Sequence, residues 1–351
     1  MKKLFLIAGL LAPVAAFGQL EWRISIKVFT GAGGALPRTP NWNLGGANTL
    51  QELTNGVIYA NNVLDATGRG YRWQLTEVVT LPGTTAPLPA STNSWFNLIV
   101  NPTTQDDLDT KAKANAVAFQ YRNNAINFYY VNNNAGPNGG YCAFPTENQH
   151  VITVAPNSFA DVLIHEAGHF FNLQHTHNTE AFQNANGSAC TNNPPCTCAR
   201  LLGGDDGIAD TPLDNECWTR DGVAQAAFGQ NYTNLNGGQQ FFVDATWLNV
   251  MSYHSPGVRF TDDQLDVMTD NSNAGRFPVV TGRTRFVNRN GNAGNQQGTS
   301  ALPFVTVLGG INAATDGDIV LIRSGSYNDP NTYTRPMTFR ATRGEVTIGQ
   351  P

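Results

Sequence analysis

The stretch HEAGHFFNLQH, from His165 to His175, decides how the rest of the chain is interpreted. The chain has only 6 histidines, and this short stretch holds three of them. On a helix, residues four apart lie on the same face, so His165 and His169 can bind one metal ion together. Glu166 follows the first histidine, where its carboxylate can reach a water on the metal rather than the metal itself.

A third ligand requires a sharp turn after this helix. His175 lies six residues beyond His169, and a continuing helix would carry it away from the shared face. Asn172 can make the turn, because after glycine asparagine tolerates a positive φ angle best. Three neutral imidazoles leave a fourth position on zinc for water, which is typical of a catalytic rather than a structural site. The sequence therefore predicts a catalytic zinc centre.

The surrounding pattern predicts an α+β fold. Alternating apolar residues predict strands in RISIKVF, YRWQLTEVV, AINFYYV and HVITVAP. Apolar positions spaced three and four apart predict helices over 50–64 and 108–119, and capping residues at Asn157–Ser158 and Thr261 signal two more. Between residues 172 and 249 the chain is rich in Gly, Asn, Asp and Cys. We expect a twisted mixed sheet and the histidine helix over an irregular lower subdomain.

Composition and charge limit the location and the partners. The chain has 351 residues with 41% hydrophobic content, enough for two domains, and a net charge of -5 that excludes nucleic-acid partners. Lys2–Lys3, an apolar run and small residues predict a signal peptide over residues 1–18, with a buried N-terminal helix as the alternative. We expect a secreted protein, extracellular or periplasmic, with no membrane span in its mature form. Its oligomeric state is not predicted.

Cysteine usage agrees with an oxidising compartment. Four of the 5 cysteines lie close together at Cys190, Cys196, Cys198 and Cys217, and Cys142 stands apart. Four cysteines can pair in three ways, and the sequence does not choose among them. Cys196 and Cys198 are too close to pair comfortably with each other, so we expect each to bridge to one of the other two. A Cys-x-Cys metal site is the alternative.

Several motifs together resemble a known family. The pattern HExxHxxGxxH is the zinc-binding consensus of the metzincin metallopeptidases, and Asn172 stands where that consensus has glycine. NVMSYH places Met251 and Tyr253 as in the metzincin methionine turn. GDDGIADTP and GGYCAFP resemble segments of the pappalysin and cytophagalysin group, and the resemblance covers roughly residues 22–275.

The resemblance implies roles for individual residues. It implies that Met251 lies beneath the metal and that Tyr253 hydrogen-bonds the oxyanion; ordinary packing is the alternative for both. Members of the group bind structural calcium, and oxygen donors of the right type are present here. Solvated loop acids are the alternative reading of these four residues: Asp205, Asp206, Asp210 and Thr211.

The segment after residue 280 has a different pattern. PFVTVLGGINAA, TDGDIVLIRSGSY and RPMTFRATRGEVTIG resemble the first coils of a right-handed parallel β-helix of the pectin-lyase-like kind. Short β-branched runs between Gly, Asp and Asn turns independently predict a small all-β segment. We therefore expect a signal peptide over 1–18, a catalytic domain over 19–280 and a β-rich segment over 281–351 that is either appended or an incomplete β-helix.

These features predict a secreted zinc metalloendopeptidase acting on protein or peptide substrates. Its expected reaction is Glu166-assisted attack of a zinc-bound water on the peptide carbonyl. A catalytically degenerate surface-binding or adhesion protein that uses the C-terminal β segment is the alternative. A processing protease with a single partner substrate is a third hypothesis. The cleavage preference cannot be derived from the residues.

Overall fold

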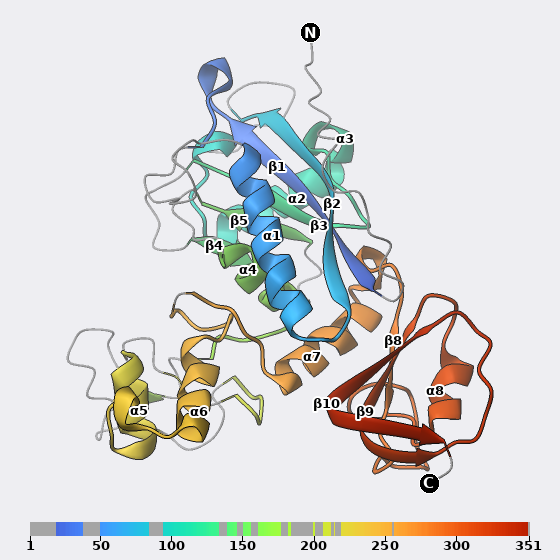
Figure 1. The fold of residues 1–351 in the computed structure, drawn as a ribbon. Coiled ribbons are helices and arrows are strands. Elements are labelled where there is room, and N and C mark those ends of the chain that lie inside the picture. Colours follow the sequence, from blue (N-terminus) through green and yellow to red (C-terminus); the bar gives the residue numbers. More distant parts are fainter. Residues whose placement is uncertain are drawn as a thin grey trace. The chain divides into compact units, whose positions relative to one another are not determined.

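A mixed five-stranded sheet forms the first part of the protein in the computed structural model (Figure 1). Its strands lie in the order β2-β1-β3-β5-β4. All neighbours pair in parallel except β4, which is antiparallel to β5 at one edge. The four predicted strands are confirmed, and GGYCAFP contributes the edge strand. The strand bounds are β1 Leu20–Thr30, β2 Tyr71–Pro82, β3 Ile126–Tyr130, β4 Gly140–Cys142 and β5 Val151–Val154.

The structure describes most of the chain with several gaps. Three of the predicted features lie outside the described residues: the signal peptide, the helix cap at Asn157–Ser158 and the four clustered cysteines. The described residues are 19–37, 50–83, 94–132, 139–145, 150–155, 161–176, 182–183, 199–200, 206–211, 214, 219–254 and 256–349. They fall into two units, one with residues 1–166 and 269–351 and the other with residues 167–268.

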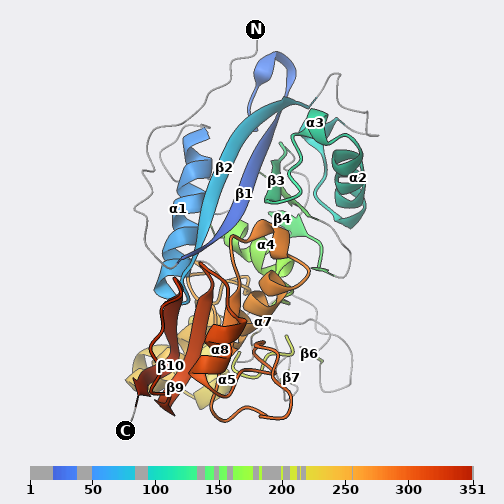
Figure 2. The same ribbon diagram turned by 90° about the vertical axis from the view of Figure 1, so that its right-hand side faces the viewer.

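Helices lie on both faces of the sheet in the first unit. α1, Leu50–Ala66, lies on one side in Figure 2, and α2, Pro102–Ala114, with α3, Ala116–Phe119, lies on the other. α1 ends before Gly68, which has a φ of 69°. The single helix expected over 108–119 is instead two, because the backbone of Asn115 leaves the helical region (φ -128°, ψ 49°).

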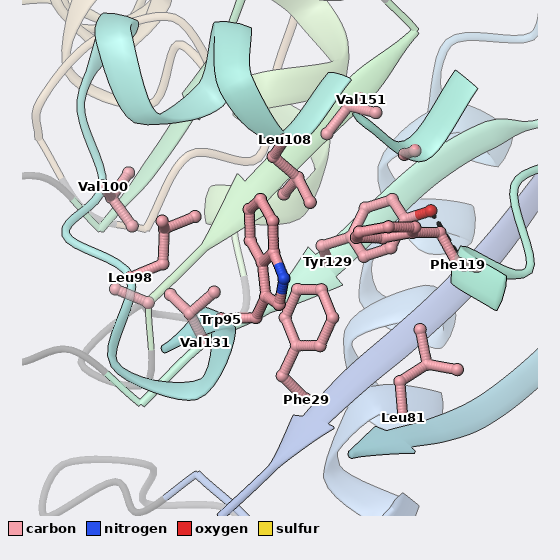
Figure 3. Packing of buried hydrophobic residues seen from close by; sticks show 12 residues of the cluster. Phe29, Leu81, Trp95, Leu98, Val100, Leu108, Phe119, Tyr129, Val131 and Val151 are labelled. Carbon is pink, nitrogen blue, oxygen red and sulfur yellow. Dashed lines mark hydrogen bonds between the residues drawn. The ribbon is translucent and has the colours of Figure 1, made fainter. Parts of the chain in front are cut away.

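The face that carries α2 and α3 holds an aromatic core (Figure 3). Phe29 stacks on Trp95 and Tyr129, with ring centroids 6.0 and 5.5 Å apart. The Tyr129 hydroxyl donates a hydrogen bond of 2.9 Å to the Phe119 carbonyl, so its polar end is satisfied inside the core. Since helices cover both faces, β1 is buried along nearly its whole length. The buried sheet thus provides a rigid framework for the edge strand β4 and the segments beside it.

Residues 167–268 contain more regular structure than the sequence predicts. The expectation of an irregular segment from 172 to 249 is wrong for residues 220–247, which form α5, Arg220–Phe228, and α6, Gly237–Trp247. Both helices begin at side-chain caps, Thr219 and Asn236. The described residues of this range also include an antiparallel pair of two-residue strands, β6 Phe182–Gln183 and β7 Ala199–Arg200. The buried positions between α5 and α6 are Val223, Ala224, Leu235 and Val243.

Two further helices contain the residues at which the chain passes from one unit to the other. α4, Val162–Phe170, is the predicted histidine helix, and the division falls within it after Glu166. α7, Asp262–Asn273, is the helix predicted after Thr261. Thr261 and Gln264 cap its start reciprocally: the Gln264 N–H donates to the Thr261 hydroxyl, and the Thr261 N–H donates to the Gln264 side chain. Short 3-10 helices cover Ala32–Gly34, Trp95–Asn97, Tyr232–Asn234 and Phe277–Val279.

The C-terminal segment forms a second sheet. β8 Thr284–Val287, β9 Ile319–Asn328 and β10 Thr338–Gly349 pair in parallel in the order β10-β9-β8. The first of the three predicted β pieces contains a helix instead, α8 Val307–Ala313. The Tyr71 hydroxyl is 2.8 Å from the Thr284 hydroxyl, which ties β8 to β2 within the first unit. The likeness to a β-helix and the boundary at residue 280 stay predictions. None of the described helices has both the length and the apolar character that a membrane crossing needs.

Candidate metal centre

α4 places two of the predicted ligands on one helical face. His165 and His169 are four residues apart within this helix and are only 9% and 6% exposed. The His165 N–H donates a helical hydrogen bond of 3.0 Å to the Asp161 carbonyl, so the first turn is already formed where the ligands begin. Both imidazoles are therefore held by regular, buried backbone rather than by a loop.

The turn after α4 is formed at Asn172. Its φ is 77°, the left-handed value that the sequence predicts for this position. The Leu173 N–H donates to the Gly168 carbonyl and the Asn172 N–H donates to the His169 carbonyl, both at 2.9 Å. This pair of bonds is the Schellman motif that ends helices at a left-handed residue. The chain reverses here and brings His175 back toward the helix.

The three histidines meet after this turn. Their ligand atoms all lie within 4.8 Å of one another, and His169 Nε2 is 3.0 Å from His175 Nε2. His169 Nδ1 is 2.7 Å from the Leu173 carbonyl, which can only accept, so the proton sits on Nδ1. The lone pair of Nε2 thus faces the other two rings. Three converging imidazoles match the donor set of a catalytic zinc site, and the residues present fit this ion.

Glu166 lies beside the metal centre with its carboxylate against the edge strand β4. The side chain is 6% exposed, and burial raises the pKa of its carboxyl to about 8. A methyl group on Gly140 would come within 2.7 Å of Glu166 Oε1, so the absence of a side chain at that position makes room for the carboxylate. A divalent cation beside it would favour the ionised form. Glycine at 140 is thus part of what positions the carboxylate.

Met251 packs directly beneath α4. A methyl group on Gly168 would lie 2.3 Å from its sulfur, so the glycine allows the methionine to reach the helix backbone. The Met251 N–H donates to the Asn249 side chain at 2.9 Å, and the Met251 carbonyl accepts from the Thr176 N–H at 3.1 Å. The predicted methionine turn therefore contacts both the histidine helix and the residue after His175.

Tyr253 lies next to the third histidine. Its ring centroid is 4.7 Å from that of His175, and the side chain is 57% exposed. An exposed phenol beside a metal ligand is able to contact a molecule that approaches the centre. This arrangement differs from the packing alternative, in which the ring would be buried.

Three of the four residues considered for calcium, Asp206, Asp210 and Thr211, are described by the structure. Asp205 lies outside the described residues. Asp206 is buried, which raises its pKa to about 6, and its Oδ1 accepts from the Ile208 N–H at 2.9 Å. Asp210 is exposed and Thr211 is buried. Within the part of the chain that the structure describes, the histidines alone gather three such ligands, so calcium at these residues stays a prediction.

Four residues near the centre were not predicted from the sequence to support it. Gly140 and Gly168 leave space for the side chains of Glu166 and Met251. Asp214 and His254 form a buried contact with each other, with 2.8 Å between His254 Nε2 and Asp214 Oδ1. Each depends on a partner distant along the chain, so no spacing pattern reveals it.

The converging histidines and the adjacent carboxylate define a centre of the metallopeptidase type. A family model of Peptidase M43, described as pregnancy-associated plasma protein-A, matches residues 118–273. This range contains the three histidines, Glu166, Met251 and Tyr253. The match confirms the resemblance to metzincin metallopeptidases of the pappalysin group.

Two solved structures are similar to the chain. Mature mirolysin of Tannerella forsythia in complex with a cleaved peptide is 14% identical, with a TM-score of 0.41, over 75% of this chain and 96% of that chain. A chaperone-substrate complex is 12% identical, with a TM-score of 0.35, over 74% of this chain. The chain spans 36% of the length of that second structure. No curated protein matches the chain.

Proposed function

We propose that the protein is a secreted zinc-dependent metalloendopeptidase. The observation that carries the proposal is the convergence of three histidine nitrogens within 4.8 Å of one another on and just after a helix that also presents Glu166. The Peptidase M43 match over the same range supports peptide hydrolysis as the reaction. Protein or peptide chains are the substrate class.

His165, His169 and His175 would hold the metal. Zinc in such a site acts as a Lewis acid toward the scissile carbonyl and makes a nucleophile available at neutral pH. The hydrogen bond from His169 Nδ1 to the Leu173 carbonyl fixes this ring in the tautomer that leaves Nε2 free to bind. Asn172 supplies the turn without which His175 would point elsewhere.

Glu166 is the proposed general base. It would accept a proton from the attacking water and deliver it to the leaving amine. Its burial beside Gly140 restricts the carboxylate to one narrow position, which favours a proton transfer in fixed geometry.

Tyr253 is the proposed stabiliser of the oxyanion. Its hydroxyl would donate a hydrogen bond to the oxygen that gains negative charge as the carbonyl is attacked. The exposure of the ring and its contact with His175 support this role, because the side chain lies beside the centre yet stays open to substrate. A Tyr253→Phe variant should lower kcat while KM changes little, since the bond forms in the transition state.

Secretion is proposed from the N-terminal sequence. Lys2–Lys3, the apolar run and the small residues that follow support a signal peptide over residues 1–18. Expression of the full chain in a host with an export pathway should release a protein whose first residue is Gln19. An N-terminus still at Met1 in the exported fraction would contradict the signal peptide.

The decisive experiment measures zinc content and proteolysis in one preparation. The wild-type chain should contain one zinc and cleave casein, and a chelator should stop cleavage. Glu166→Ala should keep the zinc and the fold but lose nearly all hydrolysis. A chain that contains no zinc and cleaves nothing would contradict the proposal and favour the adhesion protein. Zinc binding without casein cleavage would instead point to a processing protease with one partner substrate.

A further inference from the structure

The second unit contains a buried carboxylate that the proposed reaction does not use. Asp214 is fully buried. Its Oδ2 accepts a hydrogen bond of 2.6 Å from the Thr176 hydroxyl, and its Oδ1 is 2.8 Å from His254 Nε2. Because a buried carboxylate is costly unless it is hydrogen-bonded, these two bonds fix its position closely.

The two partners of Asp214 directly follow two residues of the metal centre. Thr176 comes immediately after His175, and His254 comes immediately after Tyr253. Asp214 therefore cross-links the segment that carries the third histidine to the segment that carries the tyrosine. The rings of His175 and Tyr253 lie 4.7 Å apart, and the cross-link spans the backbone positions next to them.

Further contacts hold the two segments around this cross-link. The His254 ring stacks on Trp247 of α6, with centroids 4.1 Å apart and planes at 19°. The His254 N–H donates to the Ser252 hydroxyl at 2.8 Å. The Thr176 N–H donates to the Met251 carbonyl at 3.1 Å. Every one of these contacts lies within residues 167–268, so the arrangement belongs to one unit.

We propose that Asp214 is a positioning residue that fixes His175 relative to Tyr253 by bonding Thr176 and His254 at once. The inference rests on the proposed function, because it assigns Asp214 a purpose in holding the zinc ligand and the oxyanion donor together. His175 depends most on such support, because it lies beyond the end of α4 in nonhelical chain. Without the cross-link, Thr176 would lose its side-chain connection to His254 and would keep its backbone bond to Met251.

The hydrogen-bond chemistry makes Asp214→Asn the informative variant. The carboxylate accepts from both partners, whereas an amide has one accepting oxygen and a nitrogen that donates. An asparagine of the same shape therefore keeps one bond unchanged and can keep the other only if the Thr176 hydroxyl turns to accept or His254 changes tautomer, so the cross-link should be weakened. Thr176→Val tests the same cross-link from its other end, because it removes the hydroxyl with little change in volume.

The experiment measures zinc affinity by competition with a chromogenic chelator, together with kcat and KM on a peptide substrate, for the full chain. Asp214→Asn should weaken zinc binding about tenfold, at the lower end of the range for groups that support metal ligands. It should lower kcat by a similar factor with a smaller change in KM. Thr176→Val should show the same pattern in weaker form.

Asp109→Asn is the matched control. Asp109 is a buried carboxylate in α2 that accepts from the His150 N–H at 3.1 Å and pairs with Lys113 at 2.7 Å. Its replacement should lower thermal stability yet leave zinc affinity unchanged. Zinc affinity and kcat within twofold of wild type in both Asp214→Asn and Thr176→Val would overturn the inference. A wild-type chain that binds zinc but hydrolyses no peptide would count against the proposed function alone, because the zinc measurements still test Asp214.

Discussion

Replacing Gly168 with alanine should destabilise the second unit, although alanine is the better helix former. The new methyl carbon would lie 2.3 Å from the Met251 sulfur, where ordinary contacts begin near 3.4 Å. The sulfur would have to retreat by about 1 Å, and Met251 is fully buried with little room to move. Overpacking of this kind costs about 1–3 kcal/mol, against about 1 kcal/mol gained from helix propensity. We expect a net loss of up to about 2 kcal/mol.

Urea unfolding followed by circular dichroism measures this loss, with Gly56→Ala as the matched control. A methyl group on Gly56 in α1 would meet Leu163 Cδ2 at 3.4 Å, an ordinary contact, so that variant should be as stable as wild type or more stable. Removing the clash in a Gly168→Ala, Met251→Ala double variant should make the alanine at 168 favourable relative to Met251→Ala alone. The packing of methionine against the helix backbone is refuted if Gly168→Ala alone raises the stability as Gly56→Ala does.

Three other predictions concern the base, the turn and a buried lysine. Gly140→Ala should lower kcat severalfold while zinc affinity stays at the wild-type value, because its methyl group would lie 2.7 Å from the Glu166 carboxylate. Weakened zinc binding in this variant would contradict the idea that Gly140 acts only by making room for Glu166. Asn172→Val should lower zinc affinity, since a β-branched residue resists a φ of 77°, and Asn172→Gly should keep it; equal affinities would contradict the turn's importance. Burial lowers the pKa of Lys27 to about 7 from an ordinary 10.5, so only the unfolded chain holds this proton between those values. Stability should therefore rise by at most about 5 kcal/mol from pH 7 to 10.5, and a pH titration of Lys27→Met should lack that rise; an identical slope would contradict it.

Sequence periodicity predicts the elements whose burial is regular. α1 is found where three-four spacing places it. β1 is found where alternation places it, although both of its faces are covered and the polar residues Ser25 and Lys27 are buried as well. α5 and α6 lack such periodicity and were missed. The start of α6 could nevertheless have been predicted from nearby residues, since Asn236 and Gln239 form a capping box.

Some features of the metal centre follow from neighbouring residues in the sequence, and others depend on contacts between residues far apart in the chain. His165, His169 and the turn at Asn172 follow from helix geometry and the conformational freedom of one residue, and short-range sequence contains both. Asp214 and Gly140 depend on contacts with residues far along the chain. Their importance appears only when the fold brings a hydroxyl or a carboxylate against them, so no local pattern could predict it.

The central claim is that three histidines, two on α4 and one after its turn, hold a single catalytic zinc. Metal analysis of purified wild-type protein and His169→Ala, after equilibration with one equivalent of zinc and gel filtration, tests it most directly. The account predicts one zinc per wild-type chain and almost none in His169→Ala, because that imidazole lies between the other two in sequence and is 3.0 Å from His175. Stoichiometric zinc retained by His169→Ala would contradict the account.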